Sequence, residues 1–182
     1  MSGHSKWAQI KHQKAVVDAK RGKIFGKLAR AISIATRERG VDPGSNPSLR
    51  AAIQKAREMN MPNDNIERAI KKGSGTGDGA TLQEFTYEAY GPGGVAIIIC
   101  GITDNNNRTS NEIKHLISEH GAKWANPGSV LWAFEKKDSV WVSKPYSEME
   151  LLATDTAKLY KLMEVIDDHE DVQEVYANNK EA

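Results

Sequence analysis

The sequence has very little of what builds disulfide frameworks, cysteine zinc sites and membrane spans. Its 182 residues include one cysteine, Cys100, which excludes an internal disulfide and a zinc site built on cysteines. No apolar run reaches the roughly 18 residues that predict a membrane-spanning helix. The start of the chain lacks the apolar stretch that is typical of a secretory signal. A lone thiol favours a reducing compartment, so we expect a cytoplasmic protein with no membrane partner.

Acidic residues are nearly absent from the first thirty positions. MSGHSKWAQIKHQKAVVDAKRGKIFGKLAR holds eight Lys and Arg but one acid, Asp18, a net charge of +7 in a chain whose total is +1. Residues 1–72 carry +10 and residues 73–182 carry −9. Charge of one sign is costly to concentrate unless a polyanion neutralises it, so this end predicts contact with nucleic acid. A basic, acid-poor start is also a feature of mitochondrial transit peptides, but this one continues directly into a predicted packed helix.

The hydrophobic period changes once along the chain. Residues 1–72 follow a helical period, and Asn46 before Pro47 predicts a capped helix start. Residues 73–80, GSGTGDGA, are half glycine and predict a flexible linker. Residues 81–182 mix strand and helix patterns in the order β-β-α-β-β-α-β. The predicted fold class is α+β: an N-terminal all-α helical bundle, then an acidic α/β sandwich domain with its helices on one sheet face.

The individual elements follow from local patterns. The continuously apolar, β-branched run VAIIICGIT predicts a buried central strand. The other expected strands are 84–90, 130–135, 140–143 and 172–176; the expected helices are 6–18, 24–39, 47–59, a short helix ending at Gly73, 109–120 and 154–168.

Thirteen residues are candidate nucleic-acid contacts. Lys and Arg neutralise phosphates and release counterions, and an aromatic ring such as that of Trp7 can stack on an unpaired base. The alternative is a solvated helix face with Trp7 in the core, but the interleaved acids of such faces are missing. The candidates are Lys6, Trp7, Lys11, His12, Lys14, Lys20, Arg21, Lys23, Lys27, Arg30, Asn105, Asn107 and Arg108.

The last three candidates lie in DNNNRT, between the buried strand and a predicted helix. Amides, a guanidinium and backbone N–H groups at a helix start suit a phosphate or a base edge. A polar helix cap, with Asn107 or Thr109 as the capping residue, explains the same residues equally well.

Signals for catalysis or cofactors are weak. Gly75, Gly77 and Ala80 fit a dinucleotide pattern but follow a helix instead of a strand, and no phosphate-binding P-loop motif is present. Cys100 lies in an apolar strand and is best explained as a small hydrophobic residue. The acidic run 167–171 could hold a hard cation, although a solvated turn is the more ordinary explanation. We therefore predict no enzymatic activity, cofactor, metal or small-molecule substrate; the alternatives are a metal-dependent nuclease or hydrolase using Asp167 to Asp171, or a protein-interaction adaptor.

Four long motifs resemble the YebC/PmpR family, which includes the mitochondrial translational activator of cytochrome oxidase. They are GHSKWAQIKHQKAVVDAKRGKIF, NPSLRAAIQKAREMNMPNDNIERAIKKGSG, YEAYGPGGVAIIICGITDNNNRT and DVQEVYANN. The resemblance implies an all-α domain followed by two α/β domains, with no enzymatic activity. It also implies either a transcriptional regulator that binds DNA or a translational activator that binds ribosomal RNA on the ribosome and relieves stalling.

Two features depart from the family pattern. The family usually carries Arg where this chain has Asn106. Relatives also carry about 60 more residues, the size of a small domain, between the strand near residues 130–136 and the last helix. The resemblance therefore implies a short form that lacks one α/β domain, together with any partner contact or dimerisation located on it.

Overall fold

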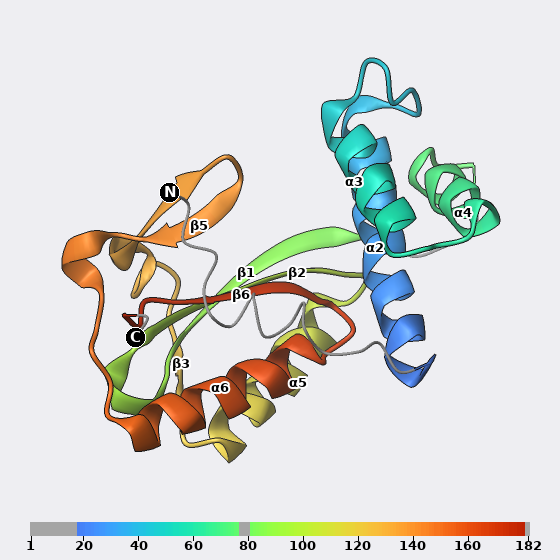
Figure 1. The fold of residues 1–182 in the computed structure, drawn as a ribbon. Helices are drawn as coiled ribbons and strands as arrows, with labels where there is room; N and C mark the ends of the chain where they lie inside the picture. Colours follow the sequence, from blue (N-terminus) through green and yellow to red (C-terminus); the bar gives the residue numbers. More distant parts are fainter. Residues whose placement is uncertain (1–17, 77–80, 181–182) are drawn as a thin grey trace. The chain divides into compact units, whose positions relative to one another are not determined.

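The computed structural model describes residues 18–76 and 81–180, which form two compact units (Figure 1). The helical unit holds the described residues up to Glu84 together with Ile102–Asn106, and the sheet unit holds Phe85–Gly101 and residues 107–180. The predicted helix 6–18 lies almost entirely outside the described residues, and so does the second half of the predicted linker. Within the described ranges, no helix combines the length and apolar character that crossing a bilayer requires.

Three helices make up the helical unit: α2 (Asp18–Arg39), α3 (Pro47–Glu58) and α4 (Asn63–Gly73). Their apolar stripes meet in a core that includes Leu28, Ile32, Leu49, Ile53 and Ile66, all at most 7% exposed. This confirms the helical period as the signal for an all-α part of the chain.

Asn46 starts α3 in the predicted way and also ties it to α2. Its side-chain oxygen accepts the backbone N–H of Leu49 at 3.0 Å, the interaction expected of an N-cap residue. Its amide nitrogen donates to the carbonyls of Ala35 and Gly40, both at 2.8 Å. Asn46 is fully buried, so the three bonds satisfy a polar side chain that would otherwise destabilise the core.

The sheet unit is built on a four-stranded sheet of order β3-β1-β2-β6. The strands are β1 (Gln83–Tyr90), β2 (Ala96–Thr103), β3 (Lys123–Ala125) and β6 (Val172–Ala177). β3 pairs antiparallel with β1, and β6 pairs antiparallel with β2. The apolar run predicted to be a central strand is β2, which has a neighbour on each side and seven buried residues out of eight.

Both faces of this sheet are covered (Figure 1). Helices α5 (Asn106–Glu119) and α6 (Ala153–Asp167) lie on one face, where Ile97 and Ile99 pack with residues such as Ile113 and Leu162. The hairpin of β4 (Phe134–Lys137) and β5 (Val140–Ser143) belongs to the other side, where Ala96 and Ile98 pack with its neighbours. The α+β class and the placement of the helices on one face are confirmed.

Two details of the predicted order were wrong. β3 was missed because its three residues are too few to show an alternating pattern. The strand expected at 130–135 begins only at Phe134, since Leu131–Ala133 forms a 3-10 turn. The order of the sheet unit is therefore β-β-α-β-β-β-α-β.

Candidate nucleic-acid interface

Four of the predicted contact residues form a basic stripe on α2 (Lys20, Lys23, Lys27 and Arg30). At about 100° per residue, the four positions fall within an arc of about 80° on the helix surface. The core residues Leu28 and Ile32 lie on the opposite side of the helix axis by the same count. Lys20 and Lys23 are exposed and Lys27 and Arg30 are half-buried, so the stripe follows the solvent side of the helix.

Helix electrostatics do not explain the stripe. Basic residues also occupy the last turn of each helix of this unit, Arg37 and Arg39 in α2, Lys55 and Arg57 in α3, and Lys71 and Lys72 in α4. Those positions stabilise the helices, because cations at a C-terminus complement the helix dipole. Three of the four stripe residues, Lys20, Lys23 and Lys27, lie in the first half of α2, where that dipole does not favour positive charge, so the dipole does not account for the stripe.

Of the other N-terminal candidates, only Arg21 lies within the described residues. Arg21 is exposed, but by the same count it lies on the side of Leu28 and Ile32, outside the stripe. The candidates that precede α2 lie outside the described residues, and their contact with nucleic acid stays a prediction: Lys6, Trp7, Lys11, His12 and Lys14.

The loop DNNNRT does not adopt the predicted cap. α5 begins at Asn106, so Asn107 and Thr109 lie inside its first turn and neither precedes the helix as an N-cap. Asn105 is the residue before the helix, and its backbone N–H donates to Thr103 Oγ1 at 2.9 Å. Asn105 and Asn107 are exposed, which leaves both as candidate contacts.

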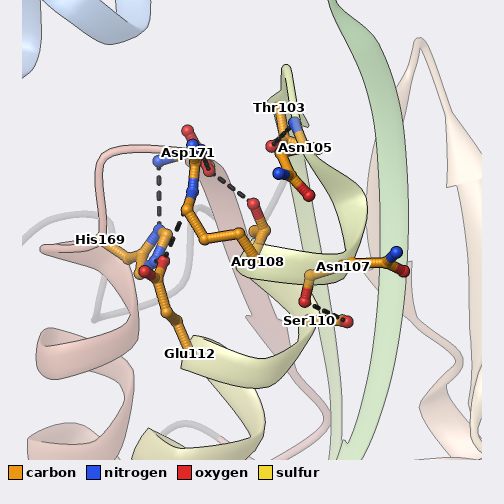
Figure 2. A network of polar contacts seen from close by, with 9 residues as sticks. Thr103, Asn105, Asn107, Arg108, Ser110, Glu112, His169 and Asp171 are labelled. Carbon is orange, nitrogen blue, oxygen red and sulfur yellow. Dashed lines mark hydrogen bonds and ion pairs between the residues drawn. The ribbon is translucent and has the colours of Figure 1, made fainter.

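Arg108 and Thr109 instead hold a buried carboxylate from the other end of the chain (Figure 2). Asp171 is fully buried, and its Oδ2 accepts from Thr109 Oγ1 at 2.6 Å and from Arg108 Nη2 at 2.8 Å. The negative charge lies at the first turn of α5, where the helix dipole stabilises it. Arg108 was predicted to contact nucleic acid, but this pairing gives its guanidinium an internal role.

His169 extends the same network (Figure 2). The backbone N–H of Asp171 donates to His169 Nδ1 at 3.2 Å, and Nε2 lies 2.9 Å from Glu112 Oε2. Because Nδ1 accepts, the proton of a neutral ring belongs on Nε2, facing the Glu112 carboxylate. The acidic run 167–171 is thus anchored to α5 through its last members.

The described residues include no group of three or more His, Cys, Asp or Glu side chains arranged to hold a metal ion. The hydrolase alternative required such a group from the acidic run. Cys100 is half-buried, and burial raises the pKa of its thiol, which disfavours the reactive thiolate.

A second buried carboxylate was missed by the sequence interpretation. Glu88 is 3% exposed and accepts the backbone N–H groups of Gly128 at 2.5 Å, Val130 at 2.7 Å and Leu131 at 3.3 Å. One strand residue thereby fixes a loop about forty positions later in the chain. A single Glu in an alternating strand gives no sign of this role, because Glu88 is in phase with the exposed residues Glu84 and Thr86, and the alternation of β1 predicts that it is exposed too.

Comparison with known proteins identifies the family. A model of the TACO1/YebC protein N-terminal domain matches residues 5–76, and a model of the TACO1/YebC second and third domain matches residues 82–154. The chain belongs to the TACO1/YebC family. The two matches cover most of the chain and leave out residues 77–81 between them.

Curated relatives of this TACO1/YebC chain carry the name probable transcriptional regulatory protein. One from Thermosipho melanesiensis is 41% identical, with 98% of this chain and 93% of the relative covered. One from Desulfosudis oleivorans is 46% identical, with 96% of this chain and 74% of the relative covered. The crystal structure of a conserved hypothetical protein from Aquifex aeolicus superimposes with a TM-score of 0.86 at 33% identity, over 97% of each chain.

This TACO1/YebC chain is shorter than such relatives. The alignment with the Thermosipho protein extends over 235 positions, whereas 98% of this chain is about 178 residues, so about 57 positions hold residues of the relative alone. The shorter chain still completes its sheet, because α6 packs in the core of the sheet unit and β6 pairs with β2.

Proposed function

We propose that this chain is a non-enzymatic regulator of gene expression that binds nucleic acid through the basic stripe of α2 and the basic residues around it. The regulatory role rests on family membership and on the names of the curated relatives. The observation that carries the binding role is the stripe, which places four cations on one face of α2, three of them in the first half, where the helix dipole does not favour them. Lys and Arg arranged in this way bind phosphates of any nucleic acid, with an affinity that falls steeply with salt.

The arrangement of the helical unit favours recognition of the sugar-phosphate backbone over reading of bases in a major groove. α3 and α4 are joined by four residues, a length that suits a helix-turn-helix. The second helix of such a motif enters the groove, but α4 carries Asp64 and Glu67 beside its basic residues. Acidic side chains on a reading helix would face phosphates at close range, so we expect structured RNA, including ribosomal RNA, to bind more tightly than a DNA promoter.

Binding of the full-length protein to matched targets tests this proposal. Fluorescence anisotropy would compare a structured ribosomal RNA fragment, a DNA duplex of equal length and the anionic polymer heparin at several salt concentrations. Co-sedimentation with ribosomes at the same salt concentrations would test binding to the intact ribosome. We expect RNA to bind more tightly than DNA, and both to weaken steeply with salt.

Each outcome has a definite meaning. Tighter binding to DNA, with sequence preference and no co-sedimentation with ribosomes, would show that the target is DNA instead of RNA. The proposed role as a nucleic-acid-binding regulator would still stand. An absence of binding to every nucleic acid at low salt would contradict the proposed function itself. Metal-dependent cleavage of either substrate, abolished by EDTA, would replace it with the nuclease alternative.

A further inference from the structure

Three exposed aromatic side chains belong to the sheet unit. Tyr146 is 76% exposed, Trp132 is 58% exposed and Tyr90 is 38% exposed. Large aromatic rings usually bury most of their surface, because each removes a large apolar area from water. We call these three residues the aromatic platform.

Two of the rings are held in place by one carbonyl. Tyr90 Oη donates to the carbonyl of Ser129 at 3.1 Å, and Trp132 Nε1 donates to the same oxygen at 3.0 Å. Both bonds engage the polar edge of a ring and leave its apolar faces available. Ser129 itself lies in the loop that the buried carboxylate of Glu88 fixes through Gly128, Val130 and Leu131. Three backbone N–H groups on one buried carboxylate tie this loop to β1, and breaking them would leave that carboxylate unsatisfied.

The third ring comes from a neighbouring turn. Trp132 lies in the 3-10 turn Leu131–Ala133, and Tyr146 lies in the 3-10 turn Pro145–Ser147. The carbonyl of Ala133 joins the two turns, because it accepts the backbone N–H of Lys144 at 2.9 Å and Ser147 Oγ at 2.6 Å. The ammonium of Lys144 lies 5.8 Å from the centre of the Tyr146 ring.

The charge around the platform differs from the rest of the sheet unit. Residues 123–144 hold four Lys and two acids, whereas residues 148–174 hold nine acids and two Lys. Of the two acids near the platform, Glu135 is paired with Lys137 at 2.6 Å. The negative charge of the sheet unit is therefore concentrated in residues 148–174, and the segment 123–144, which carries Trp132, is weakly basic.

We infer that the aromatic platform is a second nucleic-acid contact, which stacks on unpaired bases of a single strand while Lys144 and its neighbours meet the phosphates. This inference rests on the proposed function and deepens it, because it names a structural class of target. Exposed, rigidly held rings beside cations suit single strands, since every base offers a face for stacking. The ammonium of Lys144 beside the Tyr146 ring suits a phosphate better than it suits an apolar protein surface.

The test compares single-stranded and duplex RNA with the full-length protein. Anisotropy would measure binding of an oligouridine of about 12 nucleotides, and of a duplex of the same length. The variants are Trp132→Ala, Tyr146→Ala and Trp132→Phe, and the control is Leu152→Ala, which truncates an apolar residue that is 74% exposed in the same unit. Loss of one stacked ring predicts roughly tenfold weaker oligouridine binding by Trp132→Ala, with no change in salt slope. Trp132→Phe keeps a ring and retains most of the affinity, and duplex binding is unchanged in every variant.

The outcomes separate this inference from the proposed function. If the wild type binds with a steep salt slope but the alanine variants bind oligouridine equally well, the platform is not a base contact and the proposed function stands. If the wild type binds no nucleic acid, both fail. Equal losses for duplex and single strand, or losses equal to those of Leu152→Ala, also overturn the inference. Crosslinking of the wild type to oligomers containing 4-thiouridine, with mapping of the modified peptides, needs no variant: Trp132 or Tyr146 should be modified, and crosslinks confined to other segments would contradict it.

Discussion

The helical unit and the sheet unit place their charged residues in opposite ways. The helical unit carries its basic stripe on the surface, along one face of α2, where Lys20 and Lys23 are exposed. The sheet unit buries two carboxylates, Glu88 at 3% exposure and Asp171 at 0%, and uses each to hold a segment distant in sequence. Under the proposed function the first arrangement serves a nucleic-acid partner, whereas the second orders the molecule itself.

The substitution with the largest expected effect on stability should unfold the sheet unit and leave the helical unit folded. A Cβ at Gly101 would lie 2.2 Å from the Asp171 carbonyl oxygen and 2.3 Å from the Phe85 ring. Gly101→Val should therefore lower the free energy of unfolding of the sheet unit by about 4 kcal/mol or more. Thermal melts would follow tryptophan fluorescence, since Trp124, Trp132 and Trp141 all lie in the sheet unit, beside circular dichroism for the helices.

Gly22→Ala is the control for that prediction, because nothing lies within 4 Å of a Cβ at this position in α2. It should stabilise the helical unit by about 0.5 to 1 kcal/mol, as expected when alanine replaces glycine in a helix. Because the sheet unit also holds α5 and α6, the helical signal of Gly101→Val should be lost in two steps, the first with the fluorescence change and the second when α2, α3 and α4 unfold. Loss of all the helical signal in one step at the temperature of the fluorescence change would show that the two units unfold as one.

The next largest effect tests the buried carboxylate. Glu88→Ala leaves the N–H groups of Gly128, Val130 and Leu131 without their acceptor, which should cost about 2 to 4 kcal/mol in the free energy of unfolding. Denaturant unfolding followed by fluorescence would measure it. Glu84→Ala, at an exposed carboxylate on the same strand, should change stability by less than about 0.5 kcal/mol. Equal effects of the two substitutions would refute the ordering role of Glu88.

A smaller effect is expected at the hairpin between β4 and β5. Its turn residues Asp138 and Ser139 have positive φ angles of 49° and 69°, which non-glycine residues adopt at a cost. Ser139→Gly should raise the stability of the sheet unit by about 0.5 to 1 kcal/mol in a thermal melt. Ser143→Gly lies in β5, outside the positive φ region, and should destabilise; a gain there would mean that the turn is not the cause.

The same contrast explains which features could be predicted from the sequence. The helical period, the Asn46 cap and the apolar β2 strand are local patterns, and the structure confirms each of them. The basic stripe is local too, because helix geometry alone brings Lys20, Lys23 and Lys27 to one face.

The features of the sheet unit that could not be predicted depend on contacts between distant segments. Glu88 meets a loop forty positions away, and Asp171 meets the start of α5 more than sixty positions before it. No spacing rule connects such residues before the sheet order is known. For the same reason the DNNNRT loop looked equally suited to a cap or a ligand, and Arg108 showed no sign of its buried partner.

The most direct test of the central claim is the salt dependence of nucleic-acid binding by two matched double variants. Lys20→Ala/Lys23→Ala removes two cations three residues apart from the basic stripe. Lys158→Ala/Lys161→Ala removes two exposed cations with the same spacing from α6 of the sheet unit. The account predicts that the first variant lowers the slope of log affinity against log salt by about 1.4 to 1.8, while the second leaves it unchanged. An unchanged slope in the first variant, or an equal reduction in both, would contradict binding through the stripe of α2.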